Sequence, residues 1–233
     1  MLFPCIIMDI YRENIYEVIE GTRERITTLV VPKNTGLNSY AWKVLGEAGL
    51  TVNKAREIGQ NKLKVGNLTL LVRRGEDIPQ IVMDEHRRGV VVLGLTGDDL
   101  FDEYQLRNPK NPLKIENTYD WFDPAAKFFR PTLCLINRSG RVNDIPLEAR
   151  VAVNQKYRET CSYYLAKAPQ VRDKTFYTTL YSGDVEGNVA VGINDCGIEI
   201  VYTGDTLDAT RPRLKIAGIV RFTDLVVISP LKR

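Results

Sequence analysis

The alternation of strands and helices along the chain constrains its fold more than any other feature. Short runs of apolar, β-branched residues occur at 26–31, 67–74 and 90–97. A segment with helical spacing of its apolar residues follows each run, and the first such segment, 37–48, ends at Gly49, a residue suited to a helix C-terminus. Strands that are apolar throughout are typical of parallel sheets with both faces covered. The sequence therefore predicts an α/β fold.

The alternation lapses once, between Arg107 and Lys127, and then resumes. This interval holds three prolines and has no clear period, so we interpret it as a crossover or a surface insertion. Further strands are expected at 132–137, 149–154, 176–183, 197–204 and 216–228, and helices at 157–168 and 184–192. We therefore expect two α/β lobes with a polar crossover and a ligand cleft between them, since small-molecule sites favour domain interfaces.

Charge and composition exclude several classes of partner. The net charge is +3, and the basic residues are scattered rather than gathered in a stripe, which argues against nucleic acid. No apolar run reaches the roughly 18 residues of a membrane span, and the N-terminal stretch carries acids where a signal peptide is basic. The cysteines form no CxxC pair and are expected to be reduced thiols; they are Cys5, Cys134, Cys161 and Cys196. A cytoplasmic protein without a membrane or nucleic-acid partner is predicted.

The motifs of several common enzyme classes are missing. The chain has no GxSxG, P-loop, HExxH or GxGxxG sequence, which removes the usual hydrolase, NTPase and dinucleotide interpretations. Its single histidine, His86, lies in a polar stretch at a predicted helix end and is expected at the surface. A mechanism that needs histidine acid–base chemistry or histidine metal ligands is therefore disfavoured.

The stretch "GIEIVYTGDTL" is the strongest candidate for a ligand site. A small-residue turn at the end of a buried strand exposes successive backbone N–H groups, which bind anions. Thr203 and Thr206 add hydroxyl donors, Gly204 allows close approach, and Glu199 can direct a carboxylate towards sugar hydroxyls. This pattern suits a sugar phosphate. An ordinary polar turn is the alternative, because Asp205 places a negative charge beside the proposed anion.

Two other strand ends carry polar turns of the same kind. "GLTGDDL" places Thr96 and Asp99 at the start of a helix, where the aspartates could serve only as helix caps. "VPKNTG" places Lys33 and Asn34 before another helix, as an anion site or as a solvated loop. The carboxyl ends of parallel strands collect at the ligand crevice, which favours a functional role for these turns.

These turns and the segments between them resemble the ATP phosphoribosyltransferase family of histidine biosynthesis. The collinear pieces are "VVPKNTGL", "LGEAGL", "LVRRGEDIPQIV", "LGLTGDDL", "RVAVNQKYRETCSYYL", "YSGDVEGNVAVGINDCGIEIVYTGDTL" and a strand-rich "FTDLVVI". Together they cover residues 26–104 and 149–229. The most specific pieces are "EDIP" with "LGLTGDDL" and the long segment that ends in "VYTGDTL".

The resemblance implies an α/β fold of two lobes like type II periplasmic binding proteins, with a cleft between them. Lobe I is expected to comprise residues 1–125 plus 214–233, and lobe II, residues 126–213, to carry the phosphate-binding loop. By motif position, the 5′-phosphate of phosphoribosyl pyrophosphate would lie at Thr203, Gly204, Asp205, Thr206 and Leu207. Glu199 stands where the family has an aspartate for the ribose hydroxyls. The nucleotide and pyrophosphate side would involve Lys33, Asn34, Thr96 and Asp99.

The resemblance also implies the reaction and its partners. N1 of ATP would displace pyrophosphate at the anomeric carbon of phosphoribosyl pyrophosphate, with Mg²⁺ held mainly by the substrate. A chain of this length resembles the branch of the family that works with a separate regulatory subunit, and a homo-oligomer is expected. Two departures from the family pattern, Glu199 and Asp205, leave a second hypothesis open: a non-catalytic metabolite-binding or regulatory relative on the same fold.

Overall fold

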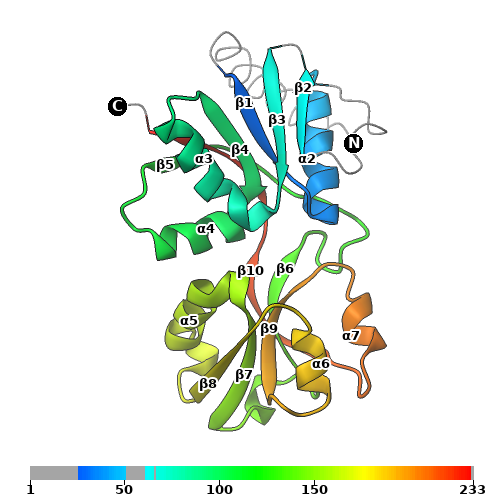
Figure 1. The fold of residues 1–233 in the computed structure, drawn as a ribbon. Helices are drawn as coiled ribbons and strands as arrows, with labels where there is room; N and C mark the ends of the chain where they lie inside the picture. The colour runs from blue at the N-terminus through cyan, green and yellow to red at the C-terminus, as the bar shows by residue number, and fades with distance from the viewer. Residues whose placement is uncertain (1–25, 51–60, 66, 232–233) are drawn as a thin grey trace, which may run out of the picture. The chain divides into compact units, whose positions relative to one another are not determined.

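The computed structural model describes residues 26–50, 61–65 and 67–231, and within it the chain divides into two compact units (Figure 1). The first unit comprises Met1–Gly97, Lys110–Tyr119 and Leu225–Arg233, and the second comprises Asp98–Pro109 and Asp120–Asp224. The predicted division differs from this one. Residues 98–109, 120–125 and 214–224, which were assigned to lobe I, belong to the second unit.

The first unit contains a six-stranded sheet in the order β2-β3-β1-β4-β11-β5. Its strands are β1 (Thr28–Pro32), β2 (Lys62–Val65), β3 (Leu68–Arg73), β4 (Val92–Gly97), β5 (Leu113–Tyr119) and β11 (Leu225–Pro230). β1 pairs in parallel with β3 and β4, whereas β2, β5 and β11 pair antiparallel with their neighbours. The carboxyl ends of three parallel strands therefore lie at one edge of this sheet.

Two helices pack on this sheet, α2 (Thr35–Glu47) and α3 (Ile78–Arg87), and a 3-10 turn at Gly75–Asp77 precedes α3. The close approach of α3 depends on Gly94 in β4. A Cβ atom at this position would lie 2.7 Å from side-chain atoms of both Ile78 and Val82. Glycine is therefore required where this helix crosses the sheet.

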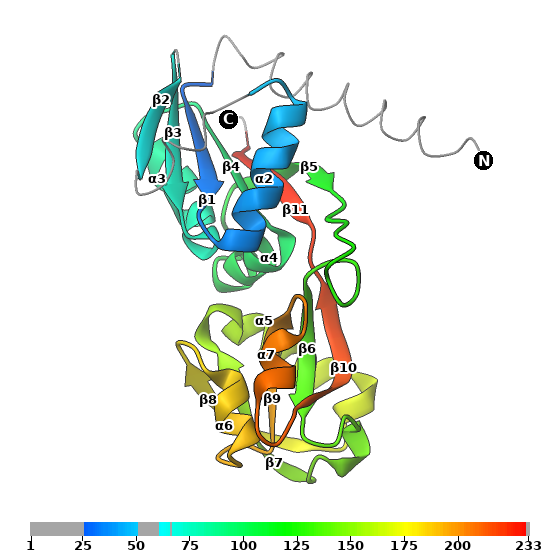
Figure 2. The same cartoon turned by 90° about the vertical axis from the view of Figure 1, so that its right-hand side faces the viewer.

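The second unit contains a five-stranded sheet in the order β10-β6-β9-β7-β8. Its strands are β6 (Thr132–Asn137), β7 (Glu148–Asn154), β8 (Thr175–Tyr181), β9 (Cys196–Val201) and β10 (Lys215–Phe222). β7 pairs in parallel with β8 and β9, and β6 pairs antiparallel with β9 and with β10, which runs beside it in Figure 2. This sheet also collects the carboxyl ends of three parallel strands at one edge.

The helices of the second unit are α4 (Asp98–Arg107), α5 (Arg158–Lys167), α6 (Val185–Ala190) and α7 (Asp205–Ala209). α6 and α7 contribute Val189 and Leu207 to one buried cluster with Ile136 of β6. α4 and α5 are joined by the buried carboxylate of Glu103, which accepts hydrogen bonds from the backbone N–H groups of Glu159 (3.0 Å) and Thr160 (2.8 Å). A carboxylate from α4 thus caps the N-terminus of α5.

The structure confirms the predicted α/β class and corrects the interval between Arg107 and Lys127. Residues 113–119 form β5 at the edge of the first sheet, instead of an irregular insertion. Only Leu113 and Tyr119 of this strand are buried, so its sequence lacks the apolar run that marks the central strands. The predicted strand at 216–228 is in fact two strands, β10 and β11, which belong to different sheets.

Two of the compositional predictions can be compared with the structure. Cys134, Cys161 and Cys196 are buried and free, as expected, and burial raises the pKa of Cys134 and of Cys196 to about 12. Cys5 lies outside the described residues. Within the described ranges, every helix is too short or too polar to cross a membrane.

Candidate functional site

Polar loops follow the three parallel strands of the second unit at their carboxyl ends. The loop after β9 contains Thr203 and Gly204, and it leads directly into α7. Gly204 adopts a left-handed conformation with φ of 94°, which residues with a Cβ rarely adopt. Thr203, Asp205 and Thr206 are exposed around it. The structure therefore forms the glycine turn with flanking hydroxyls that the sequence predicts.

The turn rests on a neighbouring segment that sequence reasoning had treated as irregular. The backbone N–H of Lys127 donates to the Tyr202 carbonyl at 2.8 Å, and the phenol of Tyr202 donates to the Asp123 carboxylate. Burial and this carboxylate raise the pKa of Tyr202 to about 12, so the phenol remains a donor at neutral pH. These contacts fix the start of the turn.

Charges of both signs surround the turn. The Thr203 hydroxyl donates to the Asp205 carboxylate at 2.8 Å, so an incoming anion has to replace this contact. The carboxylate of Asp208 is paired with Arg213, whose Nε lies 2.7 Å from Oδ1. The Lys127 side chain lies over the turn: a Cβ on Gly204 would be 3.3 Å from its Cδ and 3.7 Å from its Nζ.

A hollow of about 530 Å³ adjoins the turn and is lined by Gly204 together with Lys127, Arg213 and Lys215. Asp208 also lines it and is paired with Arg213, so Lys127 and Lys215 leave the wall with a net positive charge that favours an anionic ligand. The side chain of Leu207 is buried in the core cluster, and Leu207 is also one of the residues that line this hollow.

Glu199 is held by a partner that sequence reasoning missed. Asn154 ends β7, and the parallel register places it next to Glu199 of β9, since Val153 is opposite Ile198. Both side chains are buried, and Asn154 Nδ2 donates to Glu199 Oε2 at 3.0 Å. The backbone N–H of Ile200 donates to the other carboxylate oxygen at 2.8 Å. The carboxylate is therefore fixed at the sheet edge where the turn begins.

Asp99 is joined to the loop after β7 in the same unit. Its carboxylate is almost completely buried, and Oδ2 accepts a hydrogen bond from the Tyr157 hydroxyl at 2.7 Å. Oδ1 has no hydrogen-bond partner among the described residues. Burial raises the pKa of Asp99, and the bond from Tyr157 opposes this shift. A buried acid with one unsatisfied oxygen is a candidate for ligand contact.

The segment that leads from β8 into α6 adds two carboxylates that sequence reasoning did not single out. Asp184 is one of two non-glycine residues with positive φ in the described chain, at 54°. Burial raises the pKa of Glu186, and the carboxylates of Glu199 and Asp184 add to this shift. The signal for these residues was a polar stretch at a strand end, the same signal that identified the other turns.

Two of the candidate residues of the first unit, Asn34 and Thr96, are hydrogen-bonded to the backbone of Gly75. Asn34 Oδ1 accepts from the N–H of Gly75 at 2.7 Å, and the Thr96 hydroxyl donates to the Gly75 carbonyl at 2.9 Å. Thr96 is fully buried, whereas Lys33 is exposed. The loops after β1 and β3 are thus tied to each other and to the end of β4. Asn34 and Thr96 hold Gly75 in place, and Lys33 is the accessible member of the set.

Each unit is an α/β body in which three parallel strands end in polar loops, the arrangement that binds ligands in open α/β sheets. The family model of ATP phosphoribosyltransferase matches residues 74–230, more than half of the chain. The chain belongs to the ATP phosphoribosyltransferase family, as the sequence resemblance indicated.

Comparison with solved structures gives the following similarities. The chain is similar to the ATP phosphoribosyl transferase (HisG:HisZ) complex from Thermotoga maritima, at 17% identity and a TM-score of 0.61, over 88% of each chain. It is also similar to the B. pertussis BvgS periplasmic domain, at 13% identity and a TM-score of 0.49, over 92% of this chain and 39% of that one. An ABC transporter from Parabacteroides distasonis matches at 12% identity and a TM-score of 0.45, over 88% and 66%.

Proposed function

We propose that this protein transfers the phosphoribosyl group of phosphoribosyl pyrophosphate to N1 of ATP and releases pyrophosphate, the first step of histidine biosynthesis. Membership of the family supports the class of reaction. The observation that carries the proposal is the turn after β9. There, Gly204 with φ of 94° turns the chain beneath the Lys127 side chain and between two exposed threonines, whose hydroxyls face solvent.

This geometry supports a set of proposed substrate contacts. The 5′-phosphate binds the backbone and hydroxyls of Thr203 to Leu207, and the ribose hydroxyls bind Glu199, which Asn154 orients. The nucleotide and pyrophosphate side of the site comprises Lys33, Asn34, Thr96 and Asp99. Of these, Asn34 and Thr96 act by positioning Gly75, because their polar atoms are already bonded to it.

The chemistry needs no strong base from the protein. N1 of ATP carries a free electron pair, which forms the new bond to the anomeric carbon as the bond to the pyrophosphate oxygen breaks. The bonding electrons leave with pyrophosphate. Catalysis then comes from orientation of the two substrates and from electrostatic stabilisation of the leaving group. This agrees with a chain whose single histidine, His86, lies outside the proposed site.

Magnesium is proposed to arrive with the substrate. Among residues 26–50, 61–65 and 67–231, no group of three or more His, Cys, Asp or Glu side chains is arranged to hold a metal ion. The described residues therefore do not fit a protein cage for Mg²⁺. A magnesium complex of phosphoribosyl pyrophosphate places the ion on the pyrophosphate oxygens instead, and the protein binds that complex as its substrate.

We also propose that the chain works with a regulatory subunit and as a homo-oligomer in the cytoplasm. The similar Thermotoga maritima structure is a complex of two named components, which supports a two-component assembly. Three buried thiols without disulfides suit a reducing compartment. Neither nucleic acid nor a membrane is proposed as a partner.

Pyrophosphate release from ATP, phosphoribosyl pyrophosphate and Mg²⁺ tests the proposed function. We expect turnover by the wild-type chain and its loss in Thr206→Ala, while the thermal unfolding of this variant stays unchanged. The assay is run with and without a co-expressed regulatory subunit, if one is found. Absence of turnover in both conditions, together with tight binding of a different metabolite, would contradict the proposal.

A second candidate function rests on Asp205. Its carboxylate accepts a hydrogen bond from the Thr203 hydroxyl, the donor that the first proposal assigns to the 5′-phosphate. This arrangement favours a metabolite-binding or regulatory relative that does not turn over phosphoribosyl pyrophosphate. Pyrophosphate release by Asp205→Asn separates the two candidates. A binding protein would still bind a ligand in this variant but would release no pyrophosphate.

A further inference from the structure

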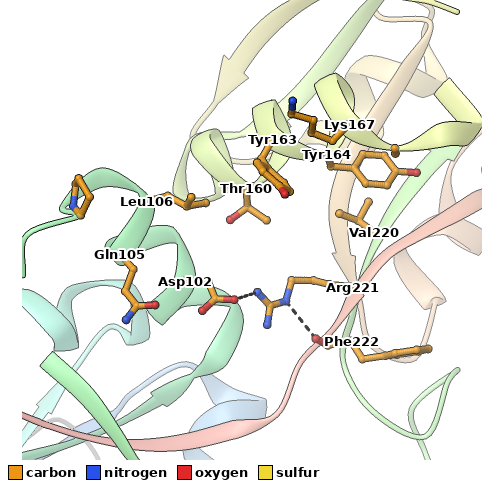
Figure 3. A pocket seen from close by; sticks show the side chains of 12 residues that line it. Asp102, Gln105, Leu106, Thr160, Tyr163, Tyr164, Lys167, Val220, Arg221 and Phe222 are labelled. Carbon is orange, nitrogen blue, oxygen red and sulfur yellow. Dashed lines mark hydrogen bonds and ion pairs between the residues drawn. The ribbon is translucent and has the colours of Figure 1, made fainter. Parts of the chain in front are cut away.

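A second hollow lies within the second unit, away from the turn after β9. It has a volume of about 680 Å³ and lies between α4, α5 and β10 (Figure 3). None of its lining residues belongs to the proposed phosphoribosyl site. Its volume falls in the range of about 300–1,000 Å³ that is typical of pockets for small molecules.

The walls of the hollow are mainly apolar and aromatic. Leu106 of α4 is 47% exposed, Tyr163 of α5 is 62% exposed and Phe222 of β10 is 46% exposed. Tyr164 and Val220 complete these walls (Figure 3). Apolar side chains that face one hollow without being covered by their own chain mark a binding surface. Three aromatic rings favour a ligand with a flat ring system.

Positive and negative charges lie on different sides of the hollow. Arg221 is shared between two carboxylates: its guanidinium pairs with Asp98 at 2.7 Å and also with Asp102. The charge of Arg221 is therefore neutralised, and two carboxylates against one guanidinium give this wall an excess of negative charge. Lys167 lies at the α5 side and forms no ion pair within the described part of the chain (Figure 3). An anionic group of a ligand is attracted to Lys167 and repelled from Asp102.

One polar group in the wall lacks a partner. Thr160 is 8% exposed, and its hydroxyl oxygen has no hydrogen bond among the described residues. Figure 3 shows its side chain directed towards the space between Leu106 and Arg221. A buried hydroxyl without a partner is unfavourable, because it has lost its hydrogen bonds to water. A polar atom on a bound ligand would relieve this cost.

We propose that this hollow binds an aromatic monoanion, a carboxylate or sulfonate with a flat ring system. The ring lies against Tyr163, Tyr164 and Phe222, and the anionic group meets the ammonium of Lys167. The site is distinct from the proposed phosphoribosyl site and does not depend on the proposed reaction. Its ligand occupies a surface that the fold leaves apolar, open and positively charged at one end.

Two fluorescent probes with the same rings test the proposal. 8-Anilinonaphthalene-1-sulfonate carries an anionic group, and N-phenyl-1-naphthylamine lacks it. We expect saturable binding of both probes at one site per full-length chain. Tyr163→Ala removes part of the aromatic wall and should weaken both. Lys167→Met should weaken only the sulfonate, by about fivefold, the factor that an exposed ion pair provides.

Matched controls separate this site from other surfaces. Lys43→Met removes an exposed helical lysine of the first unit and should leave both affinities unchanged. Excess phosphoribosyl pyrophosphate should displace neither probe. Tyr163 and Lys167 are exposed, so their variants should keep the circular dichroism spectrum of the wild type. The proposal is wrong if neither probe saturates, if Lys167→Met affects both probes equally, or if phosphoribosyl pyrophosphate displaces them.

Discussion

Two nearly identical tetrapeptides end parallel strands in the two sheets and adopt different roles. Thr96-Gly97-Asp98-Asp99 spans the last residues of β4 and the first of α4, whereas Thr203-Gly204-Asp205-Thr206 comes after β9 and runs into α7. The Thr96 hydroxyl is fully buried and bonded to the Gly75 carbonyl, whereas Thr203 is exposed.

The difference arises from where each helix begins. α4 starts at Asp98, immediately after Gly97, the last residue of β4. Three residues separate β9 from α7, and Gly204 turns the chain with positive φ. At this second turn the side chains of Thr203, Asp205 and Thr206 are exposed, although Gly204 itself is buried. Similar tetrapeptides can therefore either form a structural hydrogen bond in the core or form a candidate ligand turn, depending on where the following helix begins.

The largest effect on this comparison is expected from Gly204→Val. A branched side chain with φ of 94° is strained, and its Cβ would lie 3.3 Å from Lys127. We expect affinity for phosphoribosyl pyrophosphate to fall by about 100-fold or more, because several hydrogen bonds to a charged phosphate are lost together. Isothermal titration calorimetry measures the change. Gly46→Val, at a helical site with no atom within 4 Å of its Cβ, serves as the control; equal losses in the two variants would contradict the prediction.

The threonines of the two turns should separate binding from stability. Thr203→Val removes an exposed hydroxyl and should weaken phosphoribosyl pyrophosphate by about tenfold, the value of one hydrogen bond to a charged group, with an unchanged unfolding midpoint. Thr96→Val removes a buried hydrogen bond and should lower the free energy of unfolding by about 1–2 kcal/mol. Urea denaturation and calorimetry on both variants check this. The distinction fails if Thr203→Val destabilises the protein as much as Thr96→Val does.

Asp205, the third residue of the second tetrapeptide, is expected to have a smaller effect on the affinity for phosphoribosyl pyrophosphate. Asp205 is exposed beside the proposed phosphate and should repel it. We expect Asp205→Asn to strengthen binding of phosphoribosyl pyrophosphate by about fivefold, in keeping with about 1 kcal/mol for an exposed charge interaction. The gain should shrink as salt screens the charge. Weaker binding by this variant would show that the carboxylate supports the turn rather than opposes the ligand.

The smallest expected effect concerns Asp98. Burial, opposed by Arg221, raises its pKa from 3.8 to about 6. The folded protein therefore holds this proton more tightly than the unfolded chain does. The resulting stabilisation is complete below a pH of about 4 and is lost as the pH rises through about 6.

Asp98→Asn cannot lose a proton, so its stability should fall less steeply than that of the wild type between these pH values. Asp99, whose pKa is shifted in the same direction, remains in the variant and keeps part of the slope. Urea midpoints at several pH values measure this pH dependence of stability, with Asp205→Asn, at an exposed position, as the control. Identical slopes for Asp98→Asn and the wild type would contradict the prediction.

Sequence patterns predicted the central strands and the polar turns because these features are local. Apolar, β-branched runs mark β1, β4, β6, β7 and β9, which are buried in their sheets. The edge strand β5 escaped this pattern, since most of its residues are exposed and carry no apolar period. The glycine turn at Gly204 was predictable from the local sequence, since a glycine flanked by threonines at the end of a strand favours a turn.

The partners of the candidate residues could not be predicted, because they depend on register and on long-range packing. Asn154 and Glu199 are 45 residues apart and meet only through the pairing of β7 with β9. Lys127 lies in the interval without a clear period, yet its side chain covers Gly204. The burial of Leu207 could not be predicted either, because the sequence did not indicate the helix α7.

Binding of ribose 5-phosphate tests the central claim most directly, since this ligand has the 5′-phosphate and lacks pyrophosphate. The account predicts saturable binding by the wild type, a loss of about tenfold in Thr206→Ala, the value of one hydrogen bond to a charged group, and no change in Thr96→Val. Calorimetry with the full-length chain gives all three dissociation constants. Binding that is insensitive to Thr206→Ala but lost in Thr96→Val would place the phosphate at the wrong turn and contradict the account.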